Sequence, residues 1–172
     1  MMRVLGSVLR IIDTINAKIG EYFCWVVYVL AGLVCLEVFR RYFFNNPTTW
    51  SFEVTLWLFG VPSVLGGGYL LLDKGHVNAD IIYKRFSTRG KAILDVITSI
   101  FFFIFIGALI LHGWKMTVNA IVLKETTWSE WHPIIWPIKG SIFIGAILIL
   151  LQGIALFIRN LYTAITGKEP TI

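Results

Sequence analysis

A charged cluster lies in the segment "CLEVFRRYFFNN". Glu37 precedes Arg40 by three residues and Arg41 by four, so on a helix its carboxylate can reach either guanidinium group. Glu53, further along the chain, offers the arginines a second carboxylate. A carboxylate inside an apolar run either pairs with a cation or takes part in an ion or proton relay. We favour a structural ion-pair cluster, because no further buried ionisable group continues a path.

The three histidines are the candidates for haem or metal ligation. Haem in a four-helix protein needs axial ligands that face each other from two helices. His76 and Asp80, four residues apart in "GHVNAD", form a weak metal signal or a hydrogen bond at the level of the lipid headgroups. His112 and His132 are expected toward the other side of the membrane, without a deep two-helix arrangement. We therefore expect no catalytic residue, cofactor or metal ion on this chain, and no enzymatic activity.

Three tryptophans gather in "TWSEWHPIIWPIK", which also holds a histidine and two prolines. Trp128, Trp131 and Trp136 suit the aromatic belt at a membrane surface. Pro133 and Pro137 fit the entry and the first turn of a helix, and Lys139 can extend to the headgroups. A ligand-stacking box is the alternative, and a docking surface that includes His132 could add to the anchoring.

The elements that position these residues are long apolar runs. The chain has 172 residues, 57% of them hydrophobic, with a mean hydropathy of +0.77. Runs at 22–44, 54–72, 92–114 and 134–158 are each long enough for a helix to cross about 30 Å of hydrocarbon. Their continuity excludes the alternation of barrel strands. We predict one all-α membrane domain, with Ser87 or Thr88 capping the third helix and that helix continuing to residue 123.

The charged residues predict the topology. With four spans, ten of the fifteen Lys and Arg residues fall on the side of the N-terminus, the 74–91 loop and the C-terminal tail at 159–172. This bias places both termini in the cytoplasm, and it makes nucleic-acid binding the wrong explanation of the net charge of +5. Residues 1–21 carry aliphatic side chains at helical spacing opposite basic ones, which predicts an amphipathic helix in the headgroup layer.

Small residues in two of the spans predict close helix packing. In the second span they are Gly60, Ser63 and Gly67, around a Pro62 that should kink the helix. In the fourth span they include Ser141 and Gly145. Such faces mark helix–helix contacts more often than transport pores.

The order of these features resembles the small (Q-type) membrane subunit of tripartite ATP-independent periplasmic (TRAP) transporters. The family pattern has Arg-Tyr-hydrophobic after the first span and Trp-Ser-acidic-acidic opening the second. It is matched in "FRRYFFNNPTTWSFEV" at Arg41, Tyr42, Trp50, Ser51 and Glu53, with Phe52 in place of the first acidic residue. The family's His-hydrophobic-x-x-Asp is matched by His76, Val77 and Asp80.

The resemblance implies a supporting role in the inner (cytoplasmic) membrane of a bacterium or archaeon. In such systems a soluble periplasmic binding protein delivers an organic acid to the membrane complex. A large (M-type) subunit carries the substrate and Na⁺ sites, and the small subunit packs against its stationary scaffold. The implied partners are thus the large subunit, transiently the binding protein, and the lipid bilayer. A membrane anchor of a redox enzyme and a small self-assembling transporter are the alternatives.

Overall fold

The computed structural model describes residues 2–73 and 87–167. Its helices are α1 (Met2–Phe43), α2 (Ser51–Leu65), α3 (Gly67–Leu72), α5 (Thr88–Val122) and α6 (Trp136–Thr166). Four helical stretches are long and apolar enough to cross a membrane: Gly6–Phe43, Ser51–Leu72, Thr88–Val122 and Trp136–Thr166. The predicted all-helical architecture with four such stretches is confirmed.

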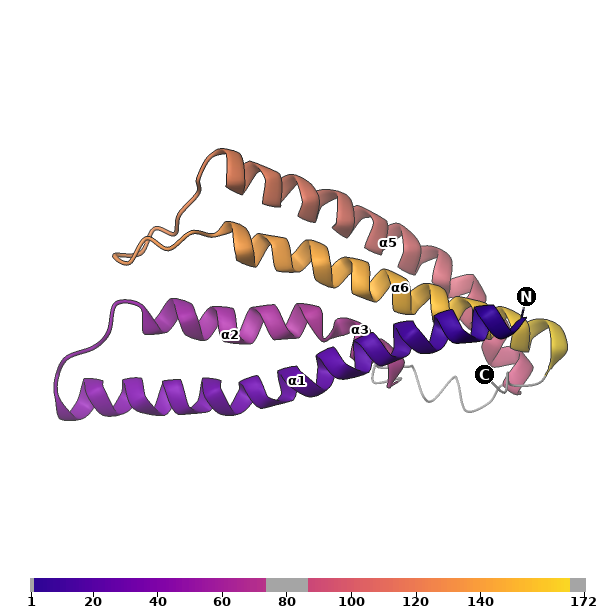
Figure 1. Cartoon of the computed structure of the whole chain (residues 1–172), viewed down its shortest axis with the longest axis horizontal. Coiled ribbons are helices and arrows are strands. Elements are labelled where there is room, and N and C mark those ends of the chain that lie inside the picture. The colour runs from indigo at the N-terminus through magenta and orange to yellow at the C-terminus, as the bar shows by residue number, and fades with distance from the viewer. Residues whose placement is uncertain (1, 74–86, 168–172) are drawn as a thin grey trace.

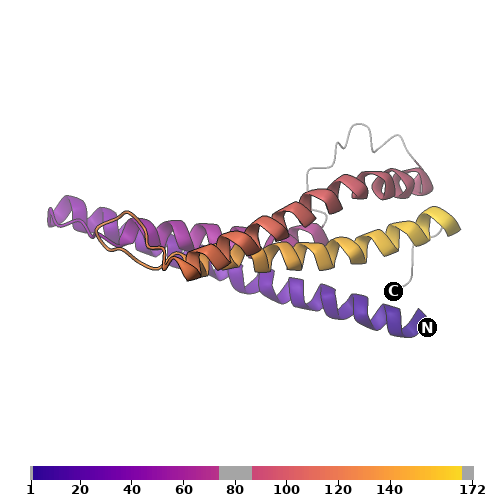
Figure 2. The ribbon, with the colours of Figure 1, turned by 90° about the horizontal axis from the view of Figure 1, so that it is seen from above.

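The helices form a layer rather than a closed bundle. In the order in which they lie side by side, α5 packs on α6, α6 on α2 and α3, and these on α1 (Figure 1). At the end where it begins, α1 also contacts α6. Seen from above, the helices fan out toward this end (Figure 2). The start of α1 and the end of α6 lie at this same end of the layer, and the α1–α2 and α5–α6 connections lie at the other.

Helix α1 is continuous across the predicted boundary between residues 21 and 22. Its 42 residues extend for about 63 Å. In its first turns the structure buries Leu9 and Asn16, whereas Val8, Ile11 and Ile15 are exposed. The aliphatic face that we predicted is therefore not the face that packs against the other helices. Its location in the headgroup layer stays a prediction.

The second span is interrupted four residues after Pro62. Gly66 separates α2 from α3, and its N–H donates to the Pro62 carbonyl at 2.7 Å. The Ser63 hydroxyl donates to the carbonyl of Phe59 at 2.6 Å. Proline lacks an N–H for the carbonyl four residues earlier, which is that of Leu58. Ser63 therefore bonds the carbonyl next to the one that Pro62 leaves free.

The long third helix is confirmed by α5, which continues well past residue 114 to Val122. At 35 residues it is about 52 Å long. Ser87 is its N-cap and accepts a hydrogen bond from the Gly90 N–H at 3.3 Å. Helix α6 has Pro137 in its first turn and continues beyond the predicted end of the span at residue 158 to Thr166, where Gly167 caps it in the left-handed conformation.

The residues buried between the helices are mostly small. Ala120, Ala146 and Ala155 are fully buried, and Ile106 is nearly so. Large side chains such as Phe101, Phe105 and Tyr28 are exposed along the helices instead. This inversion suits a lipid environment, where apolar side chains can face outward and small residues let helices approach closely.

Candidate functional site

The predicted ion-pair cluster lies where α1 ends. Arg41 Nη2 is 3.5 Å from Glu37 Oε1, with the arginine side chain 62% exposed and the glutamate 12%. The closer partner of Glu37 is Thr48, whose hydroxyl donates to Oε2 at 2.6 Å and whose backbone N–H lies 3.2 Å from Oε1. The Ser51 hydroxyl is a further hydrogen-bonding neighbour. This outer cluster (Glu37, Arg41, Thr48 and Ser51) fastens the α1–α2 connection to the last turns of α1.

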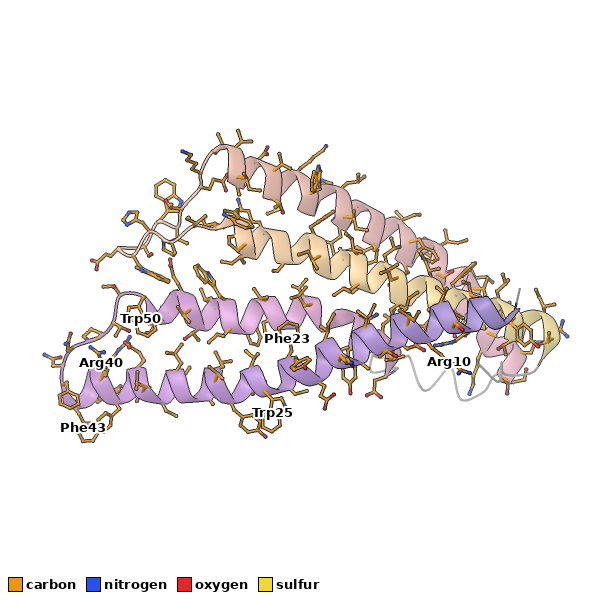
Figure 3. All side chains as sticks on the ribbon, viewed as in Figure 1. Arg10, Phe23, Trp25, Arg40, Phe43 and Trp50 are labelled. Carbon is orange, nitrogen blue, oxygen red and sulfur yellow. The ribbon has the colours of Figure 1, made fainter. Side chains whose placement is uncertain are left out.

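Arg40 and Glu53 do not join these interactions. Within residues 2–73 and 87–167 neither makes an ion pair. Arg40 extends from α1 toward the α1–α2 connection (Figure 3). Glu53 is buried, and its Oε2 atom has no hydrogen-bond partner in the described part of the chain. It shares a helix face with Trp57 and Val64, which contact the α5–α6 connection and α6, and so it points away from the arginines of α1.

The family-motif positions have different environments. Tyr42 is exposed, Trp50 directly precedes α2, and Ser51 is buried in the first turn of α2. Of these three residues, only Ser51 belongs to the outer cluster. His76 and Asp80 lie outside the described residues.

The α5–α6 connection is an ordered hairpin. Thr126 and Ile134 form a β-bridge, Thr127 N–H donates to the Pro133 carbonyl at 3.0 Å, and Ile135 N–H to that of Glu125 at 3.1 Å. His132 has a φ of 50°, a left-handed conformation that turns the chain back toward α6. The connection therefore presents its side chains in a defined arrangement.

The aromatic residues of this hairpin divide into two kinds. Trp131 packs on Trp57 of α2 with ring centroids 5.7 Å apart, whereas Trp128 is fully exposed and Trp136 half-exposed. Lys139 is paired with Glu125, not extended away from the protein as the sequence suggested. A hollow of about 630 Å³ is lined by Glu125, Thr126, Thr127, Trp128, His132, Ile135 and Lys139.

The small residues also divide. A Cβ atom on Gly145 would lie 2.6 Å from Val64 Cγ1, and one on Gly67 would lie 2.7 Å from Ile149 Cδ1. These two glycines therefore allow close contact between α6 and the second span. Gly60 has no side-chain or foreign backbone atom within 4 Å of its Cβ position, and Ser63 is exposed. Ser141 is buried and donates only to its own helix, at Ile138.

A second polar group joins α1 to α6 near the start of α1. Asn16 Nδ2 donates to Gln152 Oε1 at 2.9 Å, Gln152 Nε2 to Asp13 Oδ1 at 2.9 Å, and both terminal nitrogens of Arg159 contact the Asp13 carboxylate. Gln152 is 0% exposed and Asn16 1%. We call Asp13, Asn16, Gln152 and Arg159 the inner node.

The inner node was not predicted from the sequence. The residue that could have indicated it is Gln152, which is the single glutamine of the chain and lies inside an apolar run. A buried amide in a span needs a partner on another helix. The partners Asp13 and Asn16 are 139 and 136 residues away in the sequence.

The histidines in the described part of the chain bond their surroundings locally. His112 Nδ1 is 2.9 Å from the Ala108 carbonyl, and His132 Nδ1 is 3.0 Å from that of Glu130. Across residues 2–73 and 87–167, no three His, Cys, Asp or Glu side chains form a group that could hold a metal ion.

A comparison with known families identifies one match. The family model described as "Tripartite ATP-independent periplasmic transporters, DctQ component" matches residues 30–163. No curated protein and no solved structure matches the chain. The matched range contains the outer cluster, the hairpin, Gln152 and Arg159, whereas Asp13 and Asn16 precede it.

Proposed function

The chain belongs to the DctQ component family of the tripartite ATP-independent periplasmic transporters. We propose that it is a scaffold that packs against the large transport subunit in the membrane. As a family member it is the small membrane component of such a transporter, a transport subunit and not an enzyme. Its place is the cytoplasmic membrane, in keeping with its four apolar helices.

The observation that carries the scaffold role is the single layer of helices (Figure 1). A layer leaves broad apolar faces on α1, α2 and α5, with side chains such as Trp25, Phe59 and Phe101 exposed. Trp25 extends outward from α1, away from α2 (Figure 3). Such faces suit packing against a larger membrane protein and lipid.

Apart from Glu53, the polar side chains buried in the described part of the chain support the same division of labour. Asn16 and Gln152 bond each other, and Ser141 and Thr163 bond carbonyls of their own helix. These side chains are engaged in helix–helix or local bonds rather than directed at a ligand. The substrate and Na⁺ sites then belong to the large (M-type) subunit. The transport is Na⁺-coupled uptake of an organic acid delivered by a periplasmic binding protein.

The proposed topology has both termini in the cytoplasm. The beginning of α1 and the end of α6 at one end of the layer are compatible with it, and the excess of Lys and Arg on that side supports it. The exposed aliphatic face of the first α1 turns, with Val8, Ile11 and Ile15, would lie among the cytoplasmic headgroups.

The hairpin between α5 and α6 would then lie at the periplasmic surface. Trp131, Trp136 and Lys139 anchor and order it, while the exposed Trp128 and His132 are available to a periplasmic partner. Fully exposed aromatic rings on an ordered loop are typical anchors of protein–protein contacts.

Reconstitution tests the scaffold role. Vesicles containing both membrane subunits and supplied with the binding protein should take up substrate along a Na⁺ gradient, and vesicles lacking this chain should not. The chain should also copurify with the large subunit. Undiminished uptake without this chain would contradict the proposal, and uptake by this chain alone would favour a self-assembling transporter.

A further inference from the structure

Apolar packing alone does not specify how α1 sits against the other helices. Nearly all side chains of α1 between Tyr22 and Phe44 are apolar, on its packed and its exposed faces alike. In lipid, burying them against another helix gives little gain over leaving them among acyl chains. Along this stretch of α1, positions that differ by one turn would therefore have similar apolar contacts.

The inner node distinguishes such positions, because its bonds require one alignment. Gln152 lies seven residues before Arg159, about 10 Å along α6, and is enclosed completely. The oxygen and the nitrogen of the Gln152 amide both find a partner only when Asp13 and Asn16 of α1 lie at this level. Moving α1 by one turn, about 5.4 Å, would break both bonds.

Helix α3 completes the fit at Asn16. The Oδ1 atom of Asn16 has no hydrogen-bond partner in the described residues, and it lies against Gly68. A Cβ atom on Gly68 would be 2.1 Å from Oδ1 and 3.3 Å from the Leu148 carbonyl oxygen of α6. Glycine is therefore required where α1, α3 and α6 meet, and an α1 shifted by one turn would place Ile12 or Gly20 there, neither of which can bond Gln152.

We propose that the inner node is a register lock, in which the buried Asn16–Gln152 pair selects one alignment of α1 against α3 and α6. Buried polar pairs select register in this way in coiled coils, because apolar contacts tolerate a shift and hydrogen bonds do not. The Asp13–Arg159 ion pair, which is partly exposed, closes the lock at its outer edge.

A disulfide can report the alignment one helical turn from Asn16, at residues that make none of the hydrogen bonds of the inner node. An ideal Cβ on Gly20 would be 2.7 Å from Tyr69 Cβ, so a separation of α1 and α3 by roughly 1 Å brings the two Cβ atoms to the 3.5–4.5 Å that a disulfide needs. The reporter is the full chain with Gly20→Cys and Tyr69→Cys, and with the free cysteines Cys24 and Cys35 changed to Ser. Oxidation in membranes should link α1 to α3 efficiently.

Three variants of this reporter test the lock. Gln152→Leu removes the partner of Asn16 on α6 and leaves the Asn16 amide only the Ile12 carbonyl of its own helix, whereas Asn16→Leu with Gln152→Leu removes both amides. Thr163→Val is the matched control, because Thr163 is also buried on α6 but bonds only the Arg159 carbonyl of its own helix. Yield and melting temperature of each are measured beside the disulfide.

If the inner node sets the alignment, these variants should change the melting temperature and the disulfide yield differently. Gln152→Leu should lower both melting temperature and disulfide yield. The double variant should recover most of the melting temperature but keep a disulfide yield at least about threefold below the control. A double variant that crosslinks like the control would overturn the proposal. If neither lock variant folds, the pair is needed for stability rather than register, which also overturns it.

Discussion

The outer cluster and the inner node both tie α1 to the rest of the layer, but they do so over very different distances in the sequence. Glu37 bonds Arg41 and Thr48, which are four and eleven residues away. Gln152 bonds Asn16 and Asp13 across 136 and 139 residues. The outer cluster shapes a connection that the chain forms locally, whereas the inner node brings together helices that enter the fold separately.

The outer cluster and the inner node also differ in exposure, and exposure determines how much each contributes to the stability of the fold. The Glu37–Arg41 pair is solvated on the arginine side, where an ion pair contributes little to stability. The amides of Asn16 and Gln152 are enclosed, so removing one of them leaves an unpaired polar group that costs roughly 1–3 kcal/mol. A substitution in the inner node should therefore destabilise the protein more than a substitution in the outer cluster.

Deleting residues 2–19 should have the largest effect, because it removes Asp13 and Asn16 together and leaves Gln152 and Arg159 unpaired on α6. We expect a severalfold loss of folded protein, measured by detergent-resistant yield and gel filtration. Deleting residues 2–8 is the control, since it spares Leu9 and the whole inner node. Equal yields of the two truncations would show that α1 is held mainly by its outer part.

Gly145→Ala should follow, because Gly145 lies where α2 crosses α6 between the two polar groups. The added Cβ would meet Val64 Cγ1 at 2.6 Å and the Val64 carbonyl oxygen at 2.8 Å. Such overpacking destabilises by about 1–3 kcal/mol. Thermal unfolding of Gly60→Ala, whose Cβ would enter open space, should be unchanged or slightly higher. If both glycines tolerate alanine equally, the close contact does not limit stability.

The sequence predicted what depends on local spacing. Apolar runs located all four spans, the i, i+4 separation predicted the Glu37–Arg41 pair, and Ser87 was a recognisable cap. Helix–helix partners were not predictable in this way. Gly60 and Gly145 look alike in the sequence, but only Gly145 faces another backbone, because α2 turns Val64 and not Gly60 toward α6. The same rotation withdraws Glu53 from the arginines.

The inner node shows the limit most clearly. Asp13 and Arg159 belong to segments whose pattern predicts a headgroup-level helix and a tail, and each charge is explained there by solvent. Only the fold shows that α1 continues unbroken into the layer and that α6 extends past residue 158. Pairing two distant polar residues requires the relative rotation of both helices, which apolar periodicity in lipid leaves open.

Thr48→Val should have a moderate effect at the outer cluster. It keeps the shape and the backbone N–H but removes the hydroxyl that donates to Glu37 at 2.6 Å. We expect the melting temperature to fall by about 2–4 °C. Thr49→Val is the control on the neighbouring exposed threonine. A loss as large as that of Gln152→Leu would make the outer cluster equal to the inner node and remove the distinction between them.

Arg41→Ala should have the smallest effect on stability. Its side chain is mostly exposed, and Glu37 keeps the hydroxyl and the N–H of Thr48 when the guanidinium is removed. We expect the melting temperature to change by less than about 2 °C, and the change to disappear in high salt. Arg40→Ala provides the comparison, since Arg40 makes no ion pair in the described residues and has no salt-dependent contact with Glu37 to lose. A large, salt-independent loss in Arg41→Ala alone would mean that charge, rather than the Thr48 hydrogen bonds, holds the α1–α2 connection in place.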